Sequence, residues 1–570
     1  MSEKYKGLNN GLTNYGDDEF SKYLRRSFAK SMGYTNTSLD KPIVGICYTE
    51  SGFNNCHRNF PELLEAVKRG VTASGALPIP FPVISLGETF LNPTSMIYRN
   101  LMSMCVEEMI KAQPMDSVIL MGGCDKTVPA LLMGAFSANI PSSLLVSGPM
   151  MTGRYKEERL GACTDCRRFW AKFRSNEISE DEIKNIESNL ATTAGTCAIM
   201  GTASTMALLS DVMGIMLPGT ASIPAVHADR LRAGEETGIL AAKMAINKTN
   251  IPSKIITKKS IENAIRVLLA ISGSTNAIIH LTSIAGRLGI SISLGDLNKM
   301  SDETPVLVNL KPVGEGYMED FHASGGLDYV LLELKNHLHL DCINIEGKTL
   351  NERLNSISND YVNRSIITSK SNPLSEKGGL IALYGSLAPD GAILKRAAAS
   401  EDLLEHEGRA IVFSSLEDLA LRIDDPNLDV EENDILVLQN VGPSSNSGMP
   451  EAGYLPIPKK LSQKGVKDMI RISDARMSGS AFGTIILHVT PESNKRGPLS
   501  IIRTGDRIKL SASNKLLDVL ISKEEMEKRL SQLNNIETTP KRGYKNLYQK
   551  SVLPATKGCD FDFLINEIKD

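Results

Sequence analysis

Short apolar runs alternate with longer amphipathic segments between about residues 41 and 250. Apolar runs without helical periodicity, which predict strands, occur at residues 41–51, 77–85, 117–123 and 142–150. Segments with apolar residues at helical spacing lie between them, at residues 59–75, 98–113 and 130–139. Strands that alternate with helices form parallel sheets, whose ligands bind beyond the carboxyl ends of the strands. We therefore expect an α/β fold with site residues in three polar loops, at residues 49–59, 85–93 and 122–129.

The pattern changes in the last third of the chain. After a helical region at residues 253–289, the segment 369–379 is rich in Ser, Lys, Pro and Gly and predicts a domain boundary. Beyond it, short β-rich runs are separated by Gly, Pro and Asp turns, with few long helices. The sequence predicts an N-terminal parallel α/β domain over residues 1–373 and a smaller β-rich, barrel-like C-terminal domain over residues 374–570.

The composition is that of an ordinary globular protein, with 42% hydrophobic and 23% charged residues in a chain of 570. The formal net charge is −3, so the chain has no basic field that would bind nucleic acid or an anionic membrane. No apolar run reaches the ~18 residues of a membrane span, and the N-terminus has no apolar signal region. We expect a cytoplasmic protein without nucleic-acid or membrane partners.

Three of the nine cysteines lie in Gly-bearing or polar loops after predicted strands: Cys56, Cys124 and Cys197. Three thiolates suit an iron–sulfur cluster that keeps one coordination position open for substrate. No CxxC-type spacing links these cysteines, so spacing alone favours the alternative of three unrelated buried thiols.

Cys163 and Cys166 form a CxxC pair, a spacing that is typical of zinc and redox sites. No second pair and no nearby pair of histidines completes a tetrahedral site. We interpret this pair as a loop-packing or substrate-gating element.

A second metal is indicated by acidic residues in Gly-rich loops. Glu88, Asp125 and Glu451 offer the oxygen ligands that Mg²⁺ prefers. Lys126 follows Asp125 directly, and its ammonium group has no acceptor. It would enter such a site as an ion-pair partner or, once carbamylated, as an anionic oxygen ligand; a plain ion pair at a strand end is the simpler alternative. Ser478 lies in a Gly-flanked turn, where a serine usually serves only to stabilise the turn.

Six segments spread over most of the chain resemble the IlvD/Edd dehydratase family, which contains dihydroxy-acid, phosphogluconate and sugar-acid dehydratases. The segments are GGCDKTVPALLMGA, TAGTCAIMGTASTM, ISGSTNAIIHL, LAPDGAILK, GPSSNSGMPE and ISDARMSGSAFGT. The resemblance implies that a cluster is held by Cys56, Cys124 and Cys197. It implies Mg²⁺ ligands at Glu88, Asp125, carbamylated Lys126 and Glu451. It also implies that Ser478 is catalytic, with Lys126 at the same reaction centre.

Residues 153–179 and the segment KGCDFDFL are similar to the sugar-acid branch of this family, which includes L-arabinonate and D-xylonate dehydratases. That similarity implies a hydro-lyase that dehydrates a 2,3-dihydroxy sugar acid to a 2-keto-3-deoxy acid. The implied cofactors are a [2Fe–2S] cluster, or alternatively [4Fe–4S], and Mg²⁺. An open iron would act on the C3 hydroxyl, Mg²⁺ would stabilise the charge that develops at C2, and Ser478 would be the base. The family also implies a homodimer or homotetramer.

Two alternatives stay open. One is the dihydroxy-acid dehydratase of branched-chain amino acid biosynthesis, in which Asn-Met-Pro more often follows CDK; here Thr127, Val128 and Pro129 follow it. The other is a non-catalytic iron–sulfur sensor, which would need neither the acidic loops nor Ser478. Members of the sugar-acid branch often end in a tail with a terminal His, whereas this chain ends in INEIKD.

Overall fold

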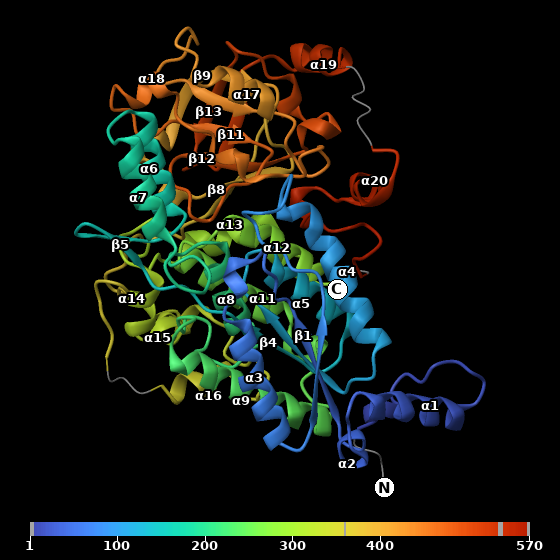
Figure 1. Ribbon diagram of the computed structural model, residues 1–570. Coiled ribbons are helices and arrows are strands. Elements are labelled where there is room, and N and C mark those ends of the chain that lie inside the picture. The colour runs from blue at the N-terminus through green and yellow to red at the C-terminus, as the bar shows by residue number, and fades with distance from the viewer. Residues whose placement is uncertain (1–4, 358–360, 534–539, 567–570) are drawn as a thin grey trace.

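The computed structural model describes residues 5–357, 361–533 and 540–566. The final residues, where the sugar-acid branch often carries its His, lie outside this range. Figure 1 shows the two halves of the chain stacked, with the N-terminal sheet and its helices below and a β-rich body above.

The N-terminal sheet is parallel, as predicted. Its strand order is β2-β1-β3-β4. The strands are β1 (Ile43–Tyr48), β2 (Leu77–Pro82), β3 (Ser117–Gly122) and β4 (Ser142–Val146). Val44 and Ile119 belong to the core formed with α3 (Phe60–Ala73) and α9 (Ala228–Asn247). Val118 points to the opposite face and packs in the core with α4 (Ser95–Ala112) and α5 (Thr127–Ala138). Both faces are covered, which explains why these strands read as continuous apolar runs.

The C-terminal sheet has the order β14-β13-β9-β10-β11-β12-β8-β7. Its strands are β7 (Ile381–Leu383), β8 (Gly391–Leu394), β9 (Glu405–Phe413), β10 (Ile435–Leu438), β11 (Arg471–Ser473), β12 (Ile485–Thr490), β13 (Arg507–Ser511) and β14 (Leu516–Val519). A bridge between Tyr384 and Leu516 joins the two edges, with Leu517 N donating to Tyr384 O at 2.8 Å. The sheet is therefore almost closed on itself, which confirms the barrel-like prediction and leaves few exposed edge groups.

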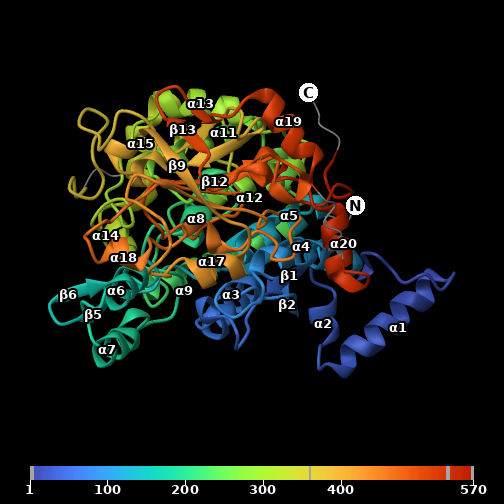
Figure 2. The same cartoon turned by 90° about the horizontal axis from the view of Figure 1, so that it is seen from above.

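Helices lie between the two sheets. They are α8 (Thr202–Val212), α11 (Lys258–Ala270), α12 (Asn276–Gly286) and α13 (Leu294–Glu303). Asn298 of α13 exchanges two hydrogen bonds of 2.9 Å with the backbone of Ala382 in β7. Figure 2, the view from above, shows α8, α11 and α12 overlapping the barrel strands β9, β12 and β13, and the two Asn298 bonds join the halves directly.

Two further segments cross between the halves. The helices α6 (Thr164–Arg174) and α7 (Glu180–Leu190) rise beside the barrel in Figure 1, and Arg174 pairs there with Asp424 at 2.5 Å. The C-terminal segment with α20 (Gly543–Ser551) returns to the first half, where Asp560 forms a buried ion pair of 2.6 Å with Arg287. Loops at this junction are thus held from both sides.

The remaining α-helices are α1 (Asp18–Ser31), α2 (Asn36–Leu39), α10 (Pro252–Ile255), α14 (Met318–Ala323), α15 (Gly326–Glu333), α16 (Leu350–Asn355), α17 (Leu416–Arg422), α18 (Lys459–Ser462) and α19 (Lys523–Ser531). Among the residues that the structure describes, no helix combines the length and the apolar character that crossing a membrane requires.

Candidate functional site

Three carboxylates from distant loops meet at the junction. Glu88 follows β2, Asp125 follows β3, and Glu451 begins a short 3₁₀ turn, Glu451–Tyr454, in the C-terminal half. Each offers an oxygen within 4.8 Å of the other two. The predicted acidic residues therefore do come together, and their oxygens form the kind of donor set that a hard divalent cation prefers.

Two buried cations compensate these carboxylates. Lys126 Nζ forms an ion pair with Asp125 and lies 3.3 Å from Glu88 Oε2. Arg476 bridges the two halves of the chain, with Nη1 2.6 Å from Glu451 Oε1 and Nη2 2.8 Å from Glu88 Oε1. Both cationic side chains are fully buried. Three carboxylates against two cations leave one net negative charge, so the site can accept a further positive ion.

Opposing effects set the charge states of this group. Burial raises the pKa of Glu451, and repulsion from Glu88 raises it further. Burial acts the same way on Glu88, but Arg476 and Lys126 outweigh it and hold the pKa of Glu88 well below its usual range. Burial lowers the pKa of Lys126, yet the surrounding carboxylates turn the net shift upward. Lys126 is therefore an ammonium while it serves as the cation of this site.

The three predicted cluster cysteines also converge. Cys56 lies in the 3₁₀ turn Asn55–His57, and its thiol interacts with that of Cys124, which follows β3, and raises the pKa of Cys124. Both lie within electrostatic range of Cys197, which belongs to the loop between α7 and α8. Cys197 has a partner that the sequence did not predict, because its Sγ is 2.9 Å from the Sγ of Cys163.

The thiols interact in two pairs, Cys163 with Cys197 and Cys56 with Cys124. Within the described ranges, no three thiols have sulfurs that all lie within 4.8 Å of one another. A single tetrahedral metal would need sulfurs about 3.8 Å apart, from a metal–sulfur bond of ~2.3 Å. Two pairs instead suit a binuclear centre with a pair at each metal. Cys124 Sγ is also 3.5 Å from Asp125 Oδ1, so the thiol group and the carboxylate group adjoin.

His57 fixes the loop that carries Cys124. Its ring lies between Thr49, whose carbonyl accepts from Nδ1 at 2.7 Å, and Phe60, on which it stacks at 4.4 Å. Nε2 accepts two backbone N–H bonds, from Gly123 at 2.9 Å and Cys124 at 3.2 Å. Burial lowers the pKa of His57 to about 4, so the ring is neutral and can accept them. No motif in the sequence points to His57 beyond its position next to Cys56.

Ser478 lies in the turn that follows Arg476. Its Oγ is 2.7 Å from Ser480 Oγ, and Thr164 donates to the Ser480 carbonyl at 3.0 Å. A Cβ on Gly479 would meet Thr202 N at 2.7 Å, so only glycine allows this turn to approach the start of α8 so closely. The turn is thus fixed against both the α6 and the α8 segments, next to the arginine of the carboxylate group.

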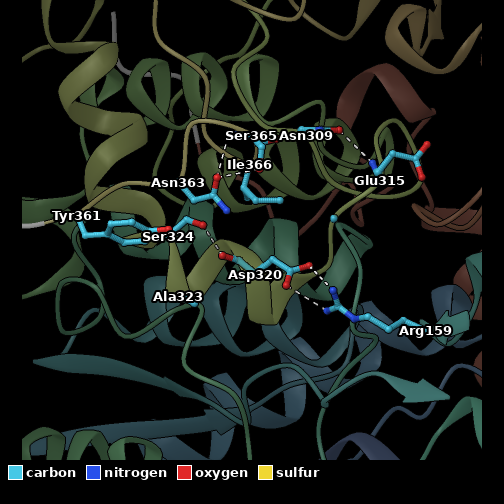
Figure 3. A pocket seen from close by; sticks show the side chains of 11 residues that line it. Arg159, Asn309, Glu315, Asp320, Ala323, Ser324, Tyr361, Asn363, Ser365 and Ile366 are labelled. Carbon is cyan, nitrogen blue, oxygen red and sulfur yellow. Dashed lines mark hydrogen bonds and ion pairs between the residues drawn. The ribbon is translucent and has the colours of Figure 1, made fainter. Parts of the chain in front are cut away.

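A separate cavity of about 470 Å³ lies beside α14. Figure 3 shows Arg159 and Asp320 paired at one end and Tyr361 at the other, with Ser324 between them. None of the predicted site residues lines it. We therefore place the site at the paired thiols and carboxylates rather than in this cavity.

Two comparisons with known proteins agree with this geometry. Residues 41–353 match the N-terminal part of dihydroxy-acid/6-phosphogluconate dehydratases, and residues 365–559 match their C-terminal part. The chain is 42% identical to an L-arabinonate dehydratase of Rhizobium leguminosarum bv. trifolii (strain WSM2304), over 96% of this chain and 95% of that protein. It is 39% identical to a 6-deoxy-6-sulfo-D-gluconate dehydratase of Pseudomonas putida, over 99% and 98%. A dihydroxy-acid dehydratase of Clostridium botulinum (strain Eklund 17B / Type B) is less similar, at 35% over 94% and 98%. The resemblance found in the sequence is thereby confirmed, and the chain belongs to the dihydroxy-acid/6-phosphogluconate (IlvD/Edd) dehydratase family.

Proposed function

We propose that this protein is a hydro-lyase that dehydrates a 2,3-dihydroxy sugar acid, such as L-arabinonate or D-xylonate, to the 2-keto-3-deoxy acid. The observation that carries the proposal is the junction of a thiol group and a carboxylate group at adjacent residues, Cys124 and Asp125. The named relatives support the substrate class, because the two sugar-acid dehydratases are 42% and 39% identical and the dihydroxy-acid dehydratase 35%.

The donor sets fit the two cofactors of the proposal. An iron–sulfur cluster would be held by Cys56, Cys124 and Cys197, and the pairing of the thiols favours [2Fe–2S] over [4Fe–4S]. Mg²⁺ would be held by Glu88, Asp125, Glu451 and a carbamylated Lys126. When bound, these groups supply a Lewis acid for the C3 hydroxyl and positive charge for the substrate carboxylate and C2 hydroxyl.

The chain itself supplies the base. We assign the removal of the C2 proton to Ser478 Oγ, which lies two residues from the buried guanidinium of Arg476. A serine hydroxyl is a weak acid, so it acts as a base only as an alkoxide next to positive charge. Ser480 Oγ, 2.7 Å away, can hold the serine oxygen in position. Arg476 lowers the pKa of Glu88, opposes the rise in the pKa of Glu451, and orients both carboxylates.

The proposal is tested with anaerobically purified enzyme and four acids: L-arabinonate, D-xylonate, 6-deoxy-6-sulfo-D-gluconate and 2,3-dihydroxyisovalerate. We expect 2-keto acid from at least one sugar acid and a much lower kcat/KM for dihydroxyisovalerate. Preference for dihydroxyisovalerate would assign the branched-chain activity instead. No keto acid from any of the four, in protein that contains iron, would favour a sensor and overturn the proposal.

We further propose a homodimer or homotetramer that acts in the cytoplasm on small molecules alone. The family resemblance and the absence of a basic field support this assembly and these partners. Light scattering on the iron-loaded protein measures the assembly, and a monomeric mass would contradict it.

A further inference from the structure

Cys163 has an unusual backbone conformation that directs its side chain into the site. Its φ of 77° and ψ of −59° are those of a γ-turn with positive φ, which is rare and strained for any residue with a side chain. Such strain persists only where surrounding contacts enforce it, and it is concentrated at functional sites. Here the strained residue places its Sγ 2.9 Å from the Sγ of Cys197.

The contacts that enforce this conformation come from both sides. Asp165 is fully buried and accepts from Gly161 N at 2.7 Å and Lys311 Nζ at 3.2 Å. Thr164 donates to the carbonyl of Ser480, in the turn of the proposed base. Cys163 is therefore held between the α6 segment and the turn that contains Ser478 and Ser480, and contacts on both sides maintain its position.

Cys166 has a different role from Cys163. Its Sγ accepts the backbone N–H of Cys163 at 3.2 Å, and the two residues form a capping box at the start of α6. A thiol that accepts at a helix start stabilises the helix. The CxxC motif therefore combines one capping thiol with one thiol that faces Cys197, and Cys166 is a matched control for Cys163.

Two reference distances bracket the contact between Cys163 and Cys197. A disulfide bond is about 2.0 Å long, and two sulfurs on one tetrahedral metal lie about 3.8 Å apart. The 2.9 Å contact lies between these two values, and Cys197 lies within electrostatic range of Cys56 and Cys124, which interact with each other. Two pairs of thiols are what a [2Fe–2S] cluster with four thiolate ligands requires.

We propose that Cys163 is a fourth thiolate ligand of the cluster in the substrate-free enzyme, on the iron that Cys197 holds. This inference rests on the proposed function, because that function requires an open position once substrate is bound. Substrate binding exchanges ligands without oxidation: the Cys163 thiolate leaves with its electron pair and takes the proton of the substrate hydroxyl that replaces it. Cys163 also lies within electrostatic range of Glu451 and Asp125, so it adjoins the carboxylate group.

The test compares wild type, C163S and C166S as anaerobic, iron-loaded proteins without substrate. The measurements are iron content, the EPR spectrum after reduction, and the reduction potential of the cluster. We expect C163S to retain iron on three thiolates, with a changed EPR spectrum and a higher potential, because a negatively charged ligand has been removed. C166S should match wild type in all three.

A second measurement uses the wild type alone, so that it does not depend on how a variant folds. Alkylation followed by mass spectrometry should label Cys163 in cluster-free protein and leave it protected in substrate-free, cluster-loaded protein. Labelling of Cys163 in the loaded protein, a disulfide between Cys163 and Cys197 in that protein, or a C163S spectrum and potential identical to wild type would overturn the inference. If one of these results is found and C163S still forms keto acid at the wild-type rate, the proposed function stands and only the role of Cys163 as a ligand is refuted.

Discussion

Removal of Arg476 tests whether this residue holds the carboxylate group together. In R476A, Glu451 loses the ion pair of 2.6 Å and Glu88 loses one of its two cationic partners, while Lys126 remains 3.3 Å from Glu88. The net charge of the group changes from −1 to −2, from three carboxylates and a single remaining cation. Breaking a buried ion pair by removing one partner costs about 3–5 kcal/mol. Because the pKa of Glu451 is already raised, this carboxylate can take up a proton and reduce that cost.

The assay is thermal unfolding of metal-free protein, followed by titration with Mg²⁺. The matched control is R507A, because Arg507 forms an exposed ion pair with Glu407 in the barrel at 2.8 Å, and such pairs contribute about 0–1 kcal/mol. We expect R476A to unfold at a clearly lower temperature than R507A, and Mg²⁺ to recover more stability in R476A than in wild type, since the ion replaces lost positive charge. Equal unfolding temperatures for R476A and R507A would refute this reasoning. So would an unfolding temperature that Mg²⁺ raises in neither R476A nor wild type.

Four further predictions follow from the site. H57Q should lower iron content, because two buried N–H groups of the Cys124 loop lose a well-placed acceptor; unchanged iron would contradict the role of His57. S478A should retain iron and Mg²⁺ but lose turnover, and measurable turnover would assign the base elsewhere. Carbamylation of Lys126, followed by ¹³CO₂ incorporation, should disappear when Mg²⁺ is chelated, because the amine then returns to its role as the cation; persistence would contradict that role. Burial, and to a lesser degree the charge of Arg476, lowers the pKa of His488 to about 3. The neutral ring therefore contributes stability above pH 6.5 that is lost as the pH falls toward 3, by roughly 5 kcal/mol in total. H488Q should show a weaker loss over that window, and parallel curves for the two proteins would contradict it.

Much of the N-terminal half was predictable because its signals are local. The continuous apolar runs at β1 and β3 and the periodic helices α3 and α4 reflect burial on both faces of a parallel sheet. The position of Cys124 and Asp125 at the end of β3 also follows from local pattern. That Cys56, Cys124 and Cys197 belong together does not, since spacing alone favoured unrelated thiols, and only the family resemblance predicted their convergence.

The residues that sequence reasoning missed act through partners distant in the chain. Arg476 was part of a quoted motif, but its bonds to Glu88 and Glu451 join segments that no periodicity relates. Cys163 was grouped with Cys166 by spacing, whereas its nearest thiol is that of Cys197. The CxxC pair lies at the start of α6, where Cys166 accepts the backbone N–H of Cys163, and its interpretation as a loop-packing or substrate-gating element stays a prediction.

The position of the site at the junction of the two halves follows from its charges. Three carboxylates cannot approach within 4.8 Å of one another unless cations are buried with them, and burying a cation is costly unless it is paired. Lys126 comes from the end of β3, whereas Glu451 and Arg476 both come from the C-terminal half, so neither half alone contains the complete site. Docking of the barrel onto the N-terminal half therefore supplies both the third carboxylate, Glu451, and the cation that is paired with it, Arg476. The same docking brings Ser478 to the carboxylates, since it shares a turn with Arg476. Assembly of the site and association of the two halves are thus one event, and a variant that loosens this junction should lose both metals together.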